Sequence, residues 1–143
     1  MHFFEAACQG IGLAVACGAL AGAFGRRDGI GTVLLVLAVV GGAILFGVSL
    51  AEEDHPAWPG WPAGALIAAG SFRVVSDFAA GAAARAEGGG FIAALIVLGA
   101  LATAGLSVIW RPLGLVALAG IIYLGVARRQ RAARKYEGLR TLR

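Results

Sequence analysis

Charge is scarce in this sequence. Only 14% of its 143 residues are Asp, Glu, Lys or Arg, whereas 59% are hydrophobic. Soluble domains carry about 25% charged residues, because they need charge over most of their surface. The composition therefore excludes an ordinary soluble fold. It predicts an integral membrane protein whose main partner is the lipid bilayer.

Cysteine and histidine are also scarce, with two residues of each. Cys8 and Cys17 both lie in the first apolar run, nine positions apart, and would point in different directions on a helix. We expect both to be small buried side chains. A disulfide framework needs more cysteines, and a zinc site needs more closely spaced ligands. The sequence therefore predicts no metal site.

Motifs of catalysis are missing as well. Two histidines offer few candidates for histidine-based general acid-base catalysis. The serines lack a Gly-x-Ser-x-Gly elbow, and no glycine-rich loop ends in Lys-Ser or Lys-Thr. We therefore expect no catalytic residue, no cofactor and no enzymatic activity.

Long apolar runs, by contrast, are abundant. A helix needs about 20 apolar residues to cross a hydrocarbon layer of about 30 Å. Short polar or Gly-rich and Pro-rich segments separate five runs: residues 3–24, 30–50, 62–84, 91–110 and 113–127. The sequence thus predicts an all-α polytopic transmembrane helical bundle over residues 1–127. The last run is short and reaches across only if Arg128 and Arg129 extend to the interface.

The third run, residues 62–84, is ambiguous. It is rich in Ala and Gly and carries Arg73 and Asp77 near its middle. Inserting these two charges costs roughly 5–7 kcal/mol, more than the roughly 2–4 kcal/mol recovered from its larger apolar residues. The run is either a span whose polar side faces other helices or an interfacial or re-entrant helix.

The distribution of charge decides between five spans and four. With five spans, Arg26, Arg27, Arg85 and the basic C-terminus lie on one side, and the acidic residues 52–54 lie on the other. Only Arg111 then opposes the positive-inside rule. We therefore favour five spans with the N-terminus outside and the C-terminus in the cytoplasm.

The C-terminal residues 128–143 contain seven basic residues and one acidic residue. They predict a basic cytoplasmic tail, either a short amphipathic helix or a disordered segment. We expect five of its residues to face anionic lipid head groups: Arg128, Arg129, Arg131, Arg134 and Lys135. Nucleic acid is not favoured as a partner, because no aromatic residues interleave with the basic ones in a folded module.

Small residues recur every fourth position in the first run, at Gly10, Ala14, Gly18 and Gly22. Such a ridge lets another helix approach closely. We expect a helix contact within the protomer. The alternative is an interface in a homo-oligomer or with another membrane protein.

Arg73 and Asp77 are four positions apart, so an ion pair on one helix face is geometrically available. Ionisable residues inside a membrane are candidates for a proton or ion pathway, but two opposite charges also neutralise each other in a polar seam. The leading hypothesis is therefore a structural or accessory membrane protein. The alternative is a small transporter or channel built around this pair.

Three features carry a resemblance: the Gly-rich first run, Pro-Ala-Gly-Ala-Leu at residues 62–66, and Arg-Lys-Tyr-Glu-Gly-Leu-Arg at residues 134–140. In these features the chain resembles small bacterial multi-span membrane proteins known only as domains of unknown function. The resemblance implies no activity and no site residues. Arg outnumbers Lys eleven to one, as is typical of GC-rich bacterial genomes. We therefore expect the inner membrane of a bacterium.

Overall fold

The computed structural model describes residues 2–25, 29–84 and 89–140. These residues form five helices and no strand: α1 (His2–Phe24), α2 (Gly29–Ala51), α3 (Gly60–Ala83), α4 (Gly89–Ile109) and α5 (Leu113–Arg140). All five are long and apolar enough to cross a membrane. The predicted all-α bundle with five transmembrane helices is confirmed.

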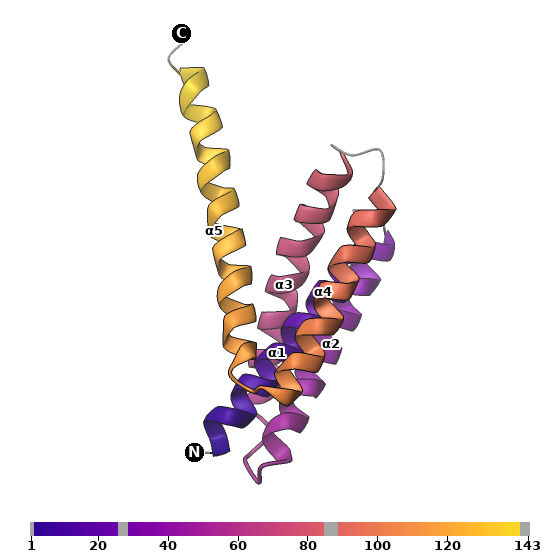
Figure 1. The fold of residues 1–143 in the computed structure, drawn as a ribbon, viewed down its shortest axis with the longest axis vertical. Coiled ribbons are helices and arrows are strands. Elements are labelled where there is room, and N and C mark those ends of the chain that lie inside the picture. The colour runs from indigo at the N-terminus through magenta and orange to yellow at the C-terminus, as the bar shows by residue number, and fades with distance from the viewer. Residues whose placement is uncertain (1, 26–28, 85–88, 141–143) are drawn as a thin grey trace.

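The helices alternate in direction along the bundle, and the two termini lie at opposite ends (Figure 1). Helix α3 runs lengthwise beside α1 and α2 and contacts both. It begins with Pro62 in its first turn, where the missing N–H of proline costs no helical hydrogen bond. The structure thus places the ambiguous third run inside the bundle rather than across its end.

Helix α1 is the centre of the bundle. None of its residues from 6 to 23 is exposed, and it contacts all four other helices. Small residues make this possible, because they let helix backbones approach one another. A Cβ atom on Gly18 would collide with the carbonyl oxygen of Ala68 on α3. One on Gly10 would collide with the ring of Phe46 on α2.

Helices α1, α2 and α3 form a tightly packed core. Ala6, Phe46 and Leu50 make one buried cluster, against which Ala63 and Ile67 of α3 also pack. Helices α2 and α3 also approach each other closely, since a Cβ on Gly42 would lie 2.5 Å from the Cβ of Ala68. These three helices therefore form the most closely packed part of the described structure.

Helices α4 and α5 are attached more loosely. Among their described side chains, only Ala100, Ser107 and Gly114 are buried. Most of their large apolar side chains point outward, with Phe91 71% and Ile109 83% exposed. In a membrane these faces meet lipid or another protein.

Helix α5 does not end near residue 127, where the sequence predicted the change from bundle to tail. It continues to Arg140 and contains 28 residues, which corresponds to about 42 Å of helix. The residues after Ala127 are mostly Arg, Ala, Gln and Lys, all good helix formers, and none is proline. Most of the predicted tail is therefore an extension of the last helix.

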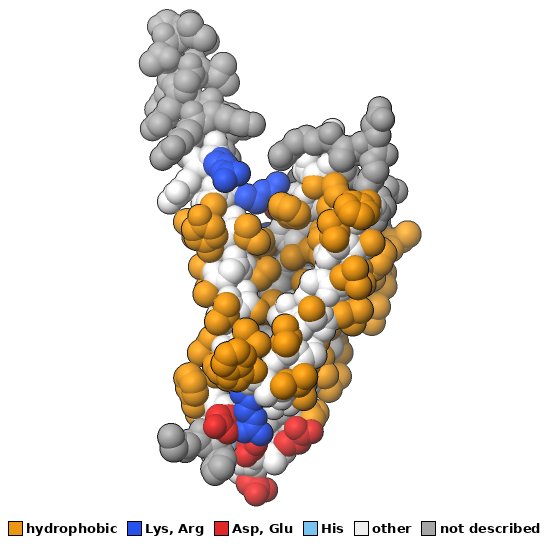
Figure 2. All heavy atoms as spheres, viewed as in Figure 1, with side chains coloured by type: hydrophobic (Ala, Val, Ile, Leu, Met, Phe, Trp, Pro, Cys, Tyr) orange, Lys and Arg blue, Asp and Glu red, His pale blue; other side chains and the backbone are white. Residues whose placement is uncertain are grey.

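Opposite charges gather at the two ends of the bundle (Figure 2). We call one the acidic end; it carries Glu5, Glu52, Glu53, Asp54 and Arg111. We call the other the basic end; it carries Arg128, Arg129 and Arg131. Arg26, Arg27 and Arg85, which also entered the predicted charge asymmetry, lie outside the described residues.

Candidate functional site: a groove between two helices

A groove of about 1630 Å³ lies between α3 and α5. It forms because α5 diverges from α3 toward the basic end, as Figure 1 shows. Helix α3 lines it with Leu66, Ile67, Gly70, Ser71, Arg73, Val74, Asp77, Ala80 and Gly81, and α5 with Leu118, Ile121, Ile122, Gly125, Val126, Arg128, Arg129 and Arg131. A second, smaller pocket of about 210 Å³ also lies between α3 and α5 and shares Arg128 and Arg131 with the groove.

The groove has an apolar part and a charged part. Leucine, isoleucine and valine side chains from both helices form the apolar part. Four arginines and one aspartate form the charged part: Arg73 and Asp77 from α3, and Arg128, Arg129 and Arg131 from α5. Blue arginine or lysine side chains are visible where the surface is hollowed at this end (Figure 2). The groove thus carries a clear excess of positive charge.

Arg128 has a buried hydrogen-bond donor that is not satisfied by the described residues. It is half-buried, and its Nη1 atom is buried without a hydrogen-bond partner in the described part of the chain. A buried cationic donor is unfavourable unless an acceptor satisfies it. The hydroxyl of Ser71, which also lines the groove, is likewise buried without a partner among these residues.

Arg73 and Asp77 are brought together in the lining of this groove, and both are exposed there. No ion pair joins them within residues 2–25, 29–84 and 89–140. The order Arg before Asp is the less favourable one for a pair four residues apart on a helix. The backbone carbonyl of Arg73 instead accepts a hydrogen bond of 3.1 Å from the hydroxyl of Ser76.

Toward the acidic end, tight backbone packing holds the first residues of α5. A Cβ on Gly114 would collide with the carbonyl oxygen of Cys8 on α1. A Cβ on Gly12 would collide with the side chain of Ser107 on α4. We call this contact of α1, α4 and α5 the base of α5. It leaves no room for even one added methyl group.

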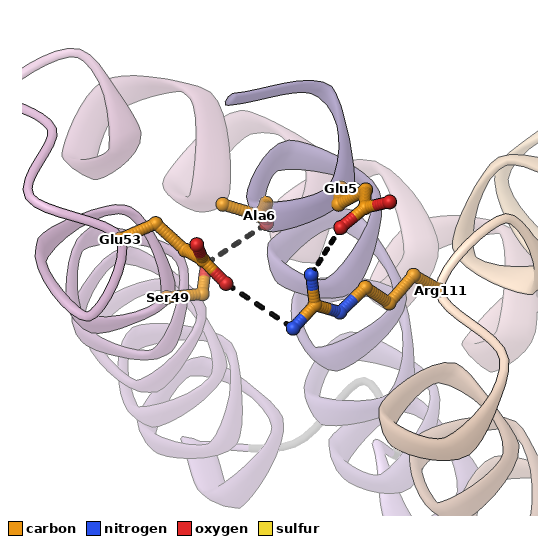
Figure 3. Close-up of polar contacts among 5 residues, drawn as sticks. All are labelled: Glu5, Ala6, Ser49, Glu53 and Arg111. Carbon is orange, nitrogen blue, oxygen red and sulfur yellow. Dashed lines mark hydrogen bonds and ion pairs between the residues drawn. The ribbon is translucent and has the colours of Figure 1, made fainter. Parts of the chain in front are cut away.

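An ion-pair bridge reinforces the base of α5 (Figure 3). Arg111 lies in the turn between α4 and α5, and its guanidinium points toward two carboxylates in Figure 3. Its Nη1 donates to Glu5 Oε2 of α1 at 2.5 Å, and its Nη2 lies 3.1 Å from Glu53 Oε1 after α2. Nearby, the hydroxyl of Ser49 donates to the carbonyl of Ala6 at 3.3 Å.

The sequence alone identified Arg111 only as an exception to the positive-inside rule. In the structure, two carboxylates at the acidic end contact Arg111 and offset its charge. The signal in the sequence was a lone arginine predicted to lie on the same side of the membrane as the acidic residues 52–54. Its partners lie far away in the chain, so the sequence could not name them.

The ridge of Gly10, Ala14, Gly18 and Gly22 lies against α2 and α3 rather than in the groove. Gly22 is also restricted, though less than Gly10 and Gly18, since an added Cβ would lie 2.8 Å from the carbonyl oxygen of Phe72 on α3. Ala14 is completely buried. A second set of small residues, Cys8, Gly12 and Ala16, has the same four-residue spacing, and Cys8 and Gly12 pack against α4 and α5.

The other predicted site residues divide into two groups. Arg128, Arg129 and Arg131 line the groove, while Arg134 and Lys135 belong to the continuation of α5 and their side chains lie outside the described part. Both cysteines are free, with Cys8 buried and Cys17 partly buried. Among the described residues, no group of three or more His, Cys, Asp or Glu side chains could hold a metal ion.

Comparison with known proteins gives no match. No protein-family model, no curated protein and no solved structure is significantly similar to this chain. The described residues form five helices that are able to cross a membrane, with a groove between α3 and α5. The residues of this groove are therefore the candidates for function.

Proposed function

We propose that this protein is a non-enzymatic accessory component of a bacterial inner membrane that binds another membrane molecule in the groove between α3 and α5. It crosses the membrane five times, with its C-terminus in the cytoplasm. The separation of a basic end from an acidic end supports this orientation, because basic residues favour the cytoplasmic side. The excess of arginine over lysine supports the bacterial source.

The contrast between the two ends of α5 carries this proposal. Toward the basic end α5 diverges from α3, whereas at its base Gly114 touches the backbone of Cys8. A transport pathway must continue to the other side of the membrane, but a binding site needs only one opening. Within the described residues, the structure thus favours binding over conduction.

The basic residues of α5 provide a second contact with the membrane. Arg128, Arg129 and Arg131, followed by Arg134 and Lys135, form a positive segment at the end of the last span. Each basic residue near an anionic surface contributes about 1 kcal/mol of attraction. We propose that this segment lies on anionic lipid at the cytoplasmic surface.

A small transporter or channel is the second candidate function. One observation favours it: Arg73 and Asp77, the two charges inside the third span, both line the groove. Intramembrane ionisable residues often form proton or ion pathways. The exposed apolar faces of α4 and α5 would then pack in a homo-oligomer and complete the wall of the pathway.

Proton flux separates the two candidates. The full chain is reconstituted in lipid vesicles that contain a pH-sensitive dye, and a potassium diffusion potential is imposed with valinomycin. We expect acidification no faster than in protein-free vesicles for the natural chain and for Asp77→Asn. Flux that Asp77→Asn abolishes, but that Glu52→Gln at the acidic end leaves intact, would establish the transporter instead.

A further inference from the structure

We infer that the groove between α3 and α5 binds a single anionic phospholipid from the leaflet at the basic end. The arginines hold its phosphate, and one acyl chain lies along the apolar part. This inference rests on the proposed function, because it requires that the groove binds a molecule rather than conducts one. It differs from contact between the basic segment and the membrane surface, since it assigns one lipid to one place.

Charge and hydrogen-bonding capacity favour a phosphate at this position. Arg73 and Arg128 face the groove from opposite helices, and Nη1 of Arg128 is a buried donor without a partner among the described residues. A guanidinium offers donors in a planar fork that matches two phosphate oxygens. A phosphate here would satisfy that donor and offset part of the positive charge.

The apolar part of the groove favours a lipid over a soluble anion. Leu66 and Ile67 of α3 lie across from Leu118 and Ile121 of α5, and all four side chains are apolar. A volume of about 1630 Å³ exceeds the roughly 300–1,000 Å³ of an ordinary small-molecule site. A long amphiphile fits such a shape, because its chain buries apolar surface while its head group reaches the arginines.

The position of the arginines along the helix suits a lipid head group. Arg128 lies 15 residues after the first residue of α5, which corresponds to about 22 Å along the helix axis. The hydrocarbon core is about 30 Å thick, and a long arginine side chain reaches several ångströms further toward the interface. The guanidinium therefore reaches the depth of the phosphate layer.

Net charge determines which lipid is preferred. Four arginines line the groove, and Asp77 is the single acidic residue in the described lining. Phosphatidylglycerol brings a net negative charge, whereas phosphatidylcholine also brings a quaternary amine that the arginines repel. We therefore expect the groove to select the anionic lipid.

Native mass spectrometry tests this inference directly. The full chain is purified in a neutral detergent, freed of lipid, and titrated in parallel with palmitoyl-oleoyl phosphatidylglycerol and phosphatidylcholine. Arg128→Gln removes a charge from the groove, and Arg134→Gln removes the same charge from the same helix six residues further on. Gly70→Leu fills the apolar part, and its control is Gly120→Leu. Both glycines have open space around an added Cβ, and only Gly70 lines the groove.

We expect one phosphatidylglycerol to bind with higher affinity than phosphatidylcholine. Arg128→Gln should lower that affinity about fivefold, as expected for the loss of one arginine near a phosphate. Gly70→Leu should lower it by a similar factor, because the added side chain occupies the place of the acyl chain. Arg134→Gln and Gly120→Leu should each change it less than twofold, within the usual scatter for surface substitutions.

Two results would overturn the inference. If both lipids bind equally, the arginines do not select the head group. If Arg128→Gln and Arg134→Gln weaken binding to the same extent, the lipid lies on the basic segment and not in the groove. Neither result affects the proposed binding function. That function would be refuted only by proton flux that depends on Asp77.

Discussion

Nη1 of Arg111 lies 2.5 Å from Oε2 of Glu5, although the two residues are 106 positions apart in the chain. The same guanidinium contacts Glu53 through Nη2. One cation therefore joins the start of α1, the end of α2 and the turn before α5. The contact also offsets the one positive charge that opposes the predicted orientation.

Removing this cation should weaken the bundle in a salt-dependent way. Arg111→Gln leaves Glu5 and Glu53 without their shared partner, and the three side chains are partly exposed. Exposed ion pairs contribute about 0.2–1 kcal/mol each. We expect the free energy of unfolding in detergent to fall by about 1 kcal/mol at low salt, as measured by thermal unfolding.

The matched control is Arg129→Gln, since Arg129 makes no ion pair in the part of the chain that the structure describes. At about 1 M salt, where the screening length is about 3 Å, the difference between natural chain and Arg111→Gln should shrink. A difference that is independent of salt would show that Arg111 acts through packing rather than charge.

The glycine ridge predicts a large difference between two leucine substitutions. Gly18→Leu places a side chain against the backbone of Ala68, which cannot move without shifting α3. Overpacking of this kind costs about 1–3 kcal/mol, and a contact with backbone belongs at the upper end. Thermal unfolding in detergent should show a clear loss of stability.

Gly105→Leu is the control for this experiment. Gly105 lies on the exposed side of α4 and has open space around an added Cβ. Leucine also has the higher helix propensity, so this variant should be as stable as the natural chain or more so. Equal losses for Gly18→Leu and Gly105→Leu would contradict the close contact of α1 with α3.

Substitutions of Asp77 and Arg73 should have opposite effects on the affinity for an anionic lipid. Asp77 contributes the acidic charge of the described groove lining and repels a phosphate, so Asp77→Asn should raise the affinity for phosphatidylglycerol several-fold. Arg73→Gln removes one of the four arginines and should lower it by a similar factor. Titration by native mass spectrometry measures both. Changes of the same sign would indicate altered folding rather than electrostatics.

The orientation in the membrane has its own test. A reporter that is active only in the periplasm should be silent when fused after Arg143 and active when inserted near Pro59. These sites lie beyond α5 and in the loop between α2 and α3. The expectation follows from the positive-inside rule, because the seven basic residues of positions 128–143 remain in the cytoplasm. An active reporter after Arg143 would contradict the five-span topology.

Much of the fold could be predicted because membrane helices leave a strong local signal. Length and hydropathy alone defined five runs, and four of the five helices begin and end within two residues of them. The third run was ambiguous because the free energy of inserting it into the bilayer was estimated for an isolated helix. In such a helix both charges face lipid. In the bundle, Ala68 and Val75 face the core while Arg73 and Asp77 face the groove.

The groove could not be predicted in the same way. It depends on how far α5 diverges from α3, and this follows from contacts between residues remote in sequence, such as Gly114 with Cys8 and Arg111 with Glu5. Helical periodicity shows which side of a helix is small or polar, but not which helix lies against it. The sequence therefore could not place Arg128 in the same groove as Arg73 and Asp77 of α3.

The contrast between the two ends of α5 also has consequences for local unfolding. Segments with few buried contacts open at lower free energy than the whole domain. Gly114 packs against the backbone of α1, whereas a Cβ added at Gly125 would meet only a side-chain carbon of Val74, at 3.4 Å. Hydrogen exchange should therefore accelerate along α5 away from its base, while the amides in the middle of α1 exchange only when the entire protein unfolds.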